Sequence, residues 1–180
     1  MKKRVSGWSV TVVVDDIPDT GLHLEIEAPP AVRAEVAELA DVRDLPGLSA
    51  VFDLVRQGAA VHVTGQVSAR VGQTCVVTLE PIENAIEEAV DLDFAPAADG
   101  AEPVPKKARK RAPSNNEPPE LLIDGMLDLG ALATEFLILG IDPYPRKPGA
   151  QFAAPKAEDA GEHPFAVLGA LKKRPGGRQP

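Results

Sequence analysis

The sequence is poor in cysteine and aromatic residues and has no long apolar run. Its only cysteine is Cys75, so an internal disulfide and any cysteine-cluster zinc or iron–sulfur site are excluded. Five Phe, one Trp and one Tyr leave Val, Leu, Ile and Ala to build most of the core. No stretch of about 18 apolar residues occurs, and the basic N-terminus lacks the apolar stretch of a signal peptide. We therefore expect a cytoplasmic protein without a membrane span.

Catalytic and cofactor-binding motifs are also missing. The sequence has no G-x-G-x-x-G, Walker A, G-x-S-x-G or kinase signature. No two of the three histidines share the i, i+4 spacing of a helical metal pair. Cys75 has the strand parity of Val77 and Leu79, which favours a small buried apolar residue over a nucleophile. We therefore predict that the protein is not an enzyme and uses no catalytic residue, metal or cofactor.

The net charge of −8 is unevenly distributed. Residues 5–105 carry 18 acidic and four basic residues, whereas residues 106–180 carry 12 basic and nine acidic ones. A strongly acidic body repels phosphates, so a broad nucleic-acid clamp is not expected there, whereas a basic protein would be attracted. The candidate face for such a protein partner consists of Glu83, Glu87, Glu88 and Asp91. The alternative interpretation is that the negative charge only keeps the protein in solution.

Alternation of apolar and polar residues predicts a mainly antiparallel sheet. In Val61–Val71 the odd positions are Val, Gly or Ala and the even ones are polar, which is typical of a strand with one buried and one wet face. Ile82–Phe94 fits a strand or a helix, and we favour the strand. Pro46-Gly47 and Gly72-Gln73 are predicted to be a break and a turn. Further strands are predicted at Val10–Val14, Leu22–Ala28, Ala50–Arg56, Cys75–Leu79 and Leu121–Ile123.

Two amphipathic segments predict helices that pack on this sheet. Pro29-Pro30 opens the first, over 31–41, and its predicted buried face is Val32, Val36, Leu39 and Ala40. Asp128 is a suitable N-cap for the second, over 129–139, which ends at Gly140. Its predicted buried residues are Leu129, Leu132, Ala133, Phe136 and Leu139. The expected fold class is therefore α+β, a mainly antiparallel sheet with two packed helices.

The chain between these elements changes in composition. Residues 95–119 contain six prolines and a basic run, which predicts a disordered insertion. It interrupts a single domain made of residues 1–94 and 120–145. Residues 146–180 are predicted to be an extended tail with a short apolar segment at 164–171.

Basic runs in the insertion and the tail are candidate contacts for RNA phosphates. They are not interleaved with aromatic residues, so base stacking is not predicted. The alternative interpretation is a solvated segment without a ligand. The candidate contacts are Lys106, Lys107, Arg109, Lys110 and Arg111 in the insertion and Lys172, Lys173 and Arg174 in the tail.

The order of these segments resembles the YceD family. The resemblance rests on the strand 61–71 with its glycine, on Cys75–Pro81 followed by an acidic β segment, on Asp124–Leu129, and on Pro164–Leu168 near the end. The matching positions are Gly65, Cys75, Leu79, Pro81, Asp128, Leu129, Glu135, Leu139, Pro143 and Pro145. Many family members read C-x-x-C where this chain has Cys75 and Thr78, and many carry cysteines after the region of Pro145. No zinc or redox role is therefore carried over.

The resemblance implies a non-enzymatic bacterial factor that supports synthesis, processing or stability of large-subunit (23S) ribosomal RNA. A direct route would use the basic runs at 2–4, 106–111 and 172–178 to touch RNA phosphates. An indirect route would use the acidic body to hold a basic ribosomal protein, and the acidic count favours this route. Neither a membrane nor DNA is an expected partner. Two alternatives stay open: an adaptor unrelated to ribosomes that docks through its apolar tail, and a metal-dependent hydrolase that uses carboxylates such as Glu80, Glu83, Asp91 and Asp93.

Overall fold

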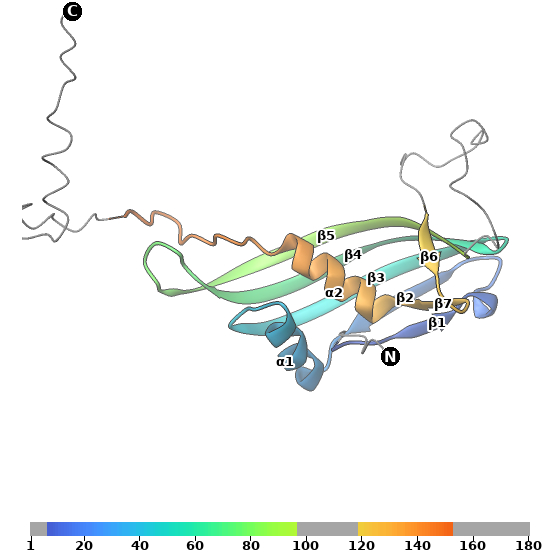
Figure 1. The fold of residues 1–180 in the computed structure, drawn as a ribbon, viewed down its shortest axis with the longest axis horizontal. Coiled ribbons are helices and arrows are strands. Elements are labelled where there is room, and N and C mark those ends of the chain that lie inside the picture. Colours follow the sequence, from blue (N-terminus) through green and yellow to red (C-terminus); the bar gives the residue numbers. More distant parts are fainter. Residues whose placement is uncertain (1–6, 97–118, 153–180) are drawn as a thin grey trace, which may run out of the picture.

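A curved five-stranded sheet forms the body of the protein in the computed structural model, which describes residues 7–96 and 119–152 (Figure 1). The elements, in order, are β1 (Thr11–Val13), the 3₁₀ turn η1 (Val14–Asp16), β2 (Leu22–Glu27), α1 (Pro30–Leu39), β3 (Asp44–Gln57), β4 (Ala60–Thr74), β5 (Pro81–Pro96), β6 (Glu120–Leu122), β7 (Met126–Asp128) and α2 (Leu129–Gly140). The predicted α+β class is confirmed.

The main sheet has the strand order β2-β3-β4-β5-β6. The first four strands pair antiparallel, as the alternation predicts, and β3, β4 and β5 are 14, 15 and 16 residues long. The short β6 pairs parallel with the last three residues of β5, from Phe94 to Pro96. Within the described residues, the edge of β5 before Phe94 therefore carries no strand partner.

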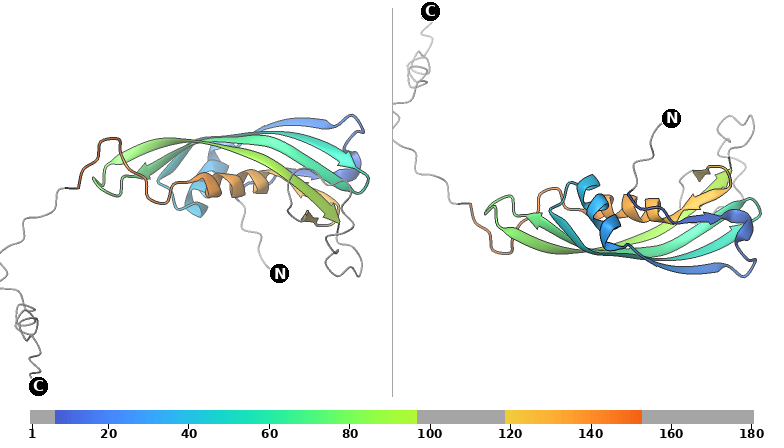
Figure 2. Two further views of the ribbon diagram at one scale, coloured as in Figure 1. Left: turned by 90° about the horizontal axis from the view of Figure 1, so that it is seen from above. Right: turned by 90° about the horizontal axis from the view of Figure 1, so that it is seen from below.

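Both helices lie on one face of the sheet, and no described helix or strand covers the other (Figure 2). The alternation along β4 sets these faces: Val61, Val63, Val67 and Val71 are fully buried, whereas polar residues between them point outwards. Buried side chains from Trp8 to Leu137 form one cluster between the sheet and the helices, with members from both sides of 97–118. The domain boundaries given above stay a prediction.

A small antiparallel ribbon of β1 and β7 closes the helix-covered side. Asp128 ends β7 and caps α2: its carboxylate accepts a hydrogen bond from the Ala131 N–H at 3.1 Å, which confirms the predicted N-cap. The same carboxylate accepts hydrogen bonds from the Val10 N–H at 3.0 Å and the Ser9 hydroxyl at 2.8 Å. One side chain thus joins the helix start to the first strand.

Two predicted chain breaks are wrong. Pro46-Gly47 lies inside β3, where the pairing with β4 shifts register between Asp44 and Gly47. The irregularity lets the strand continue through a proline, which lacks a ladder donor. Gly72-Gln73 is not a turn either, because β4 extends to Thr74.

The predicted strand Cys75–Leu79 is also wrong, since these residues form the turn between β4 and β5. Leu79 has a positive φ of 60° and is 76% exposed, so it does not share the burial of Cys75. The strand parity that linked Cys75, Val77 and Leu79 therefore does not exist. The favoured strand over Ile82–Phe94 is confirmed within β5.

The helices differ from the predictions in which residues they bury. In α2, Leu129, Ala133 and Leu137 are fully buried, whereas Leu139 is 77% exposed and Phe136 only half-buried. The sheet contacts one stripe of the helix: Phe136 packs only partly against the core, and Leu139 lies beyond it. In α1 the buried residues are Val36 and Ala37, and Leu39 is exposed. Neither helix is long and apolar enough to cross a membrane.

Candidate interaction surfaces

The uncovered face of the sheet is acidic. Residues on it alternate with the buried ones along each strand, so polar side chains from β2 to β5 form one continuous surface, which we call the outer face. Its acidic members are Glu25, Glu27, Asp44, Asp53, Glu83, Glu87, Asp91 and Asp93, against the single strand arginine Arg70. Arg70 is 3.9 Å from Glu83, too little positive charge to balance the others.

Each of the two histidines on the outer face lies between two carboxylates. His23 Nδ1 is 2.7 Å from Asp53, and its Nε2 is 3.7 Å from Glu25. The hydrogen bond to Asp53 and the charge of that carboxylate raise the pKa of His23 above its ordinary value, with a smaller contribution from Glu25. His62 has the same arrangement: its Nδ1 is 2.8 Å from Asp93, and its Nε2 is 3.7 Å from Asp91. Neither of these histidines contacts Cys75, and the third, His163, lies outside the described residues.

The sequence-predicted acidic face is divided by the sheet. Glu83, Glu87 and Asp91 lie on the outer face of β5, four residues apart in sequence, which places successive carboxylates about 13 Å apart. Glu88 lies on the helix-covered face, beside Gly140 of α2. Sequence reasoning missed Glu25, Glu27 and Asp53, because only the sheet pairing brings β2 and β3 next to β5.

These carboxylates are spread along the sheet and do not converge. Within residues 7–96 and 119–152, no three His, Cys, Asp or Glu side chains are placed to hold a metal ion. Glu80 points elsewhere: it accepts a 2.9 Å hydrogen bond from the Lys147 ammonium, which lowers the pKa of Glu80 and raises that of Lys147. The arrangement is that of a charged surface.

A second site forms where the β4–β5 turn meets the segment after α2. The Pro145 carbonyl accepts a hydrogen bond from the Val76 N–H at 2.9 Å. The buried Gln73 donates to the Asp142 carbonyl at 2.8 Å and accepts from Asn84 at 2.7 Å. Segments about 70 residues apart in sequence are thus tied together at one end of the sheet.

Cys75 lies at the centre of this junction. It is fully buried, as predicted, but its sulfur is not in apolar surroundings: it accepts hydrogen bonds from the Lys147 N–H at 3.3 Å and the Thr78 N–H at 3.4 Å. These donors stabilise the thiolate, Lys147 most strongly, and lower the pKa of Cys75 to about 6. Cys75 therefore joins the turn to the chain exit, a role that its spacing in the sequence does not reveal.

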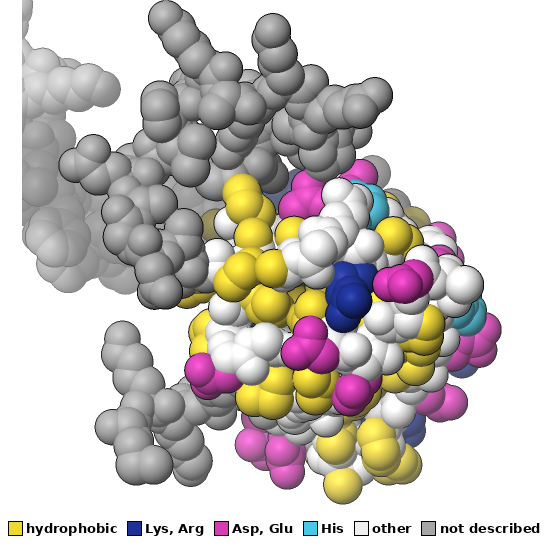
Figure 3. Space-filling model, turned by 90° about the vertical axis from the view of Figure 1, so that its right-hand side faces the viewer, with side chains coloured by type: hydrophobic (Ala, Val, Ile, Leu, Met, Phe, Trp, Pro, Cys, Tyr) yellow, Lys and Arg dark blue, Asp and Glu magenta, His cyan; other side chains and the backbone are white. Residues whose placement is uncertain are grey.

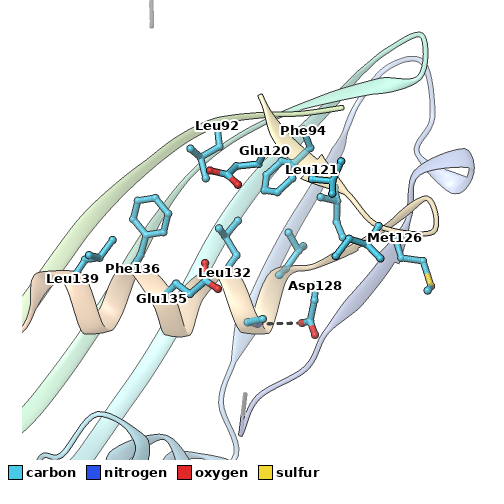
Figure 4. Close-up of a pocket in the computed structure, with 14 residues that line it drawn as sticks. Leu92, Phe94, Glu120, Leu121, Met126, Asp128, Leu132, Glu135, Phe136 and Leu139 are labelled. Atoms are coloured by element: carbon cyan, nitrogen blue, oxygen red, sulfur yellow. Dashed lines mark hydrogen bonds between the residues drawn. The ribbon is translucent and has the colours of Figure 1, made fainter. Parts of the chain in front are cut away.

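An open groove runs beside α2 on the helix-covered side (Figure 4). Its volume is about 400 Å³, and Phe136 and Leu132 of α2 face Leu92 and Phe94 of β5 across it. Leu121 of β6 is 58% exposed at one end. Figure 3 views the end of the molecule that carries β6 and η1, and shows apolar side chains gathered there among acidic ones.

The family of this chain is settled by a family model, described as the large ribosomal RNA subunit accumulation protein YceD, which matches residues 63–172. This chain belongs to the YceD family. The match begins at Val63 within β4, includes β5 to α2, and continues to residue 172. No curated protein and no solved structure matches the chain significantly.

The positions that carry the YceD resemblance fall into two groups in the structure. The first surrounds the Cys75 junction, and consists of Cys75, Leu79, Pro81, Pro143 and Pro145. The second belongs to α2 and its groove, and consists of Asp128, Leu129, Glu135 and Leu139. Gly65 is separate, in the middle of β4, where a Cβ atom would run into the Val51 carbonyl oxygen and the Phe52 ring. A backbone contact this close accepts only glycine.

The candidate RNA contacts lie outside the described residues. This holds for Lys106, Lys107, Arg109, Lys110 and Arg111, as well as for Lys172, Lys173 and Arg174. The predicted disorder of the insertion, apart from its ends, and the apolar segment 164–171 also fall there. For this YceD protein these assignments stay predictions.

Proposed function

We propose that the protein is a non-enzymatic factor that supports accumulation of large-subunit ribosomal RNA, and that it acts by holding a basic ribosomal protein on its outer face. The family name supports the first part. The observation that carries the second is the outer face itself, on which eight carboxylates surround one arginine.

The spacing of these charges suits a broad basic partner. Adjacent strands are about 4.8 Å apart, so Asp53 of β3 and Asp91 of β5, which both flank Thr64 of β4, lie about 10 Å from each other. Charges at this separation create a shared negative potential, which is screened within about 8–10 Å at physiological salt. The same potential repels RNA phosphates, so RNA itself is the less suitable ligand for this face.

The test compares three variants in cells that lack the endogenous protein. The outer-face variant carries Glu83→Gln, Glu87→Gln and Asp91→Asn. The control carries Glu35→Gln, Glu38→Gln and Asp41→Asn, which removes the same charge from exposed residues in and just after α1. The arm variant replaces the five basic residues of 106–111 with Gln. The measurements are the ratio of large- to small-subunit ribosomal RNA and the capture of large-subunit ribosomal proteins at low and high salt.

We expect the outer-face variant to lose the captured protein and to lower the RNA ratio, while the control behaves like wild type. High salt should release the partner from the wild-type protein as well. If the outer-face variant is fully active and the arm variant is not, the direct RNA route is correct. In that case the slope of log K for RNA against log salt should flatten in the arm variant by about 0.7–0.9 per lost contact. Full activity of both variants contradicts both routes.

A further inference from the structure

We propose that the groove beside α2 is the docking site for the chain's own tail, the apolar segment 164–171 together with the basic residues that follow it. The proposal is independent of the ribosomal function and rests on four features: the groove's apolar wall, its acidic rim, the free edge of β5, and the length of chain after the Cys75 junction.

The groove presents apolar surface that the fold does not use. Leu139 is 77% exposed and Leu121 58% exposed, although both line the cavity. Contiguous exposed apolar surface of this kind marks an interaction site. Beyond the described residues, the tail offers one apolar run, Pro164–Leu171, with Phe165, Val167, Leu168 and Leu171 as its large side chains.

The charges around the groove match that segment. The charged residues that line it are all acidic, namely Glu120, Asp128 and Glu135. Asp128 is occupied by its three hydrogen bonds, whereas Glu120 and Glu135 form no ion pair with any described residue. Lys172-Lys173-Arg174 directly follows the apolar run. An apolar segment with a basic end thus meets an apolar groove with an acidic rim.

The sheet edge beside the groove is open as well. β5 pairs with β6 only from Phe94 onwards, so its earlier residues leave backbone groups without a strand partner among the described residues. An extended segment can add to such an edge, with alternate side chains entering the groove. Because β6 already runs parallel to β5, a tail that followed β5 in the same direction would continue the same pairing pattern.

The chain is long enough for this path. Lys147 is fixed to Cys75 and Glu80 at the start of β5. From Pro81 to Leu92, where the groove begins, β5 rises about 36 Å. Residues 147–150 form a turn, closed by a hydrogen bond from the Ala150 N–H to the Lys147 carbonyl. The 13 residues between Ala150 and Pro164 can span about 45 Å. The tail can therefore reach the groove of its own molecule and run towards β6, which brings its basic end near Glu120.

The test places a nitroxide label at Ala170→Cys in the full-length chain and records NMR signal loss at groove residues. Because Cys75 is buried, the nitroxide reagent should react with the new cysteine at position 170. Repeating the experiment in a Cys75→Ala background tests whether any label is attached to Cys75. Signals of Leu121, Leu132 and Phe136 should fall several-fold, whereas that of Val76 at the Cys75 junction, at the opposite end of β5, should not. Leu139→Asp should restore the groove signals. Leu79→Asp changes an equally exposed leucine outside the groove, so the groove signals should remain weak in that variant.

Three outcomes would overturn the proposal. The first is signal loss that is absent from the groove or equally strong at Val76. The second is signal loss in a mixture of two chains, one carrying the nitroxide and the other carrying the NMR isotopes but no nitroxide. Such loss would mean that the groove binds the tail of a second copy. The third is Leu79→Asp having the same effect as Leu139→Asp. Hydrogen exchange on the unlabelled protein gives a check without new cysteines, because Phe165→Ser with Leu168→Ser should increase exchange several-fold along the free edge of β5.

Discussion

Adjacent residues of β3 show how differently the two faces of the sheet are built. Phe52 points to the helix-covered face and is fully buried, whereas Val51 points to the outer face and is 37% exposed. The inner face gains its stability by removing apolar surface from water. The outer face carries like charges that repel one another and stay hydrated. The inner face therefore stabilises the fold, whereas the residues of the outer face can be selected for binding a partner.

The largest effect is expected from truncation of the inner face. Phe52→Ala removes a fully buried ring and should lower the free energy of unfolding by about 3–5 kcal/mol. Val51→Ala, one residue away on the outer face, should cost about 1 kcal/mol or less. Urea unfolding of both variants measures the difference. Similar losses in the two would show that the outer face is covered in the full-length protein.

A smaller effect is expected at the joint between α2 and β1. Asp128→Ala removes the acceptor of hydrogen bonds from Val10, Ala131 and Ser9, and should cost about 2 kcal/mol, at the upper end for an N-cap. Asp128→Asn should recover most of this, since an amide oxygen also caps a helix. Asp53→Ala on the outer face, with the same side chain removed, should change unfolding much less. Equal losses would contradict the assignment of Asp128 as a structural joint.

The buried thiol gives a pH dependence of known sign. The folded pKa of Cys75, lowered to about 6, lies below the ordinary value of 9.0 for a cysteine thiol, so the fold favours the thiolate. Its stabilising contribution is fully present above about pH 9 and is lost as the pH falls through 6. Stability of the wild-type protein relative to Cys75→Ala should therefore rise from pH 6 to pH 9. A difference that is constant over this range would show that Cys75 stays a neutral thiol.

The exposed histidine should give the opposite and smallest effect. Asp53 raises the pKa of His23, so the fold favours the protonated ring. This contribution is present below the unfolded pKa of about 6.5 and is lost as the pH rises through the higher folded pKa. The stability difference between wild type and His23→Gln should decrease over that window, and high salt should reduce it further. A direct NMR titration of His23 with a pKa at or below 6.5 would contradict the pairing.

Local patterns predicted most of the elements. The alternation in Val61–Val71 gave one buried and one wet face because a strand has a period of two, and β4 follows it residue by residue. Asp128 was predicted as an N-cap because a short side-chain acceptor just before an apolar helical run can bind the free N–H groups of the first turn. The errors lie where tertiary contacts replace local preference: β3 passes through Pro46-Gly47, and Leu139 is exposed because no described helix or strand covers it.

The candidate surfaces were less predictable. Glu83, Glu87 and Asp91 were identified from charge alone, but Glu88 was wrongly joined to them, because parity along β5 separates residues that are neighbours in sequence. The Cys75 junction was missed because its partners, Pro145 and Lys147, come about 70 residues later. Short patterns do not encode such long-range contacts.

Composition, strand alternation and motif order are local properties, and they were sufficient for the fold class, the acidic character of the body and the membership of the YceD family. The folded chain was needed to show which carboxylates share a face, which N–H groups donate to Cys75, and that an apolar groove lies open beside α2. Each of these depends on strand register and on the packing of segments far apart in the chain, which no single segment specifies.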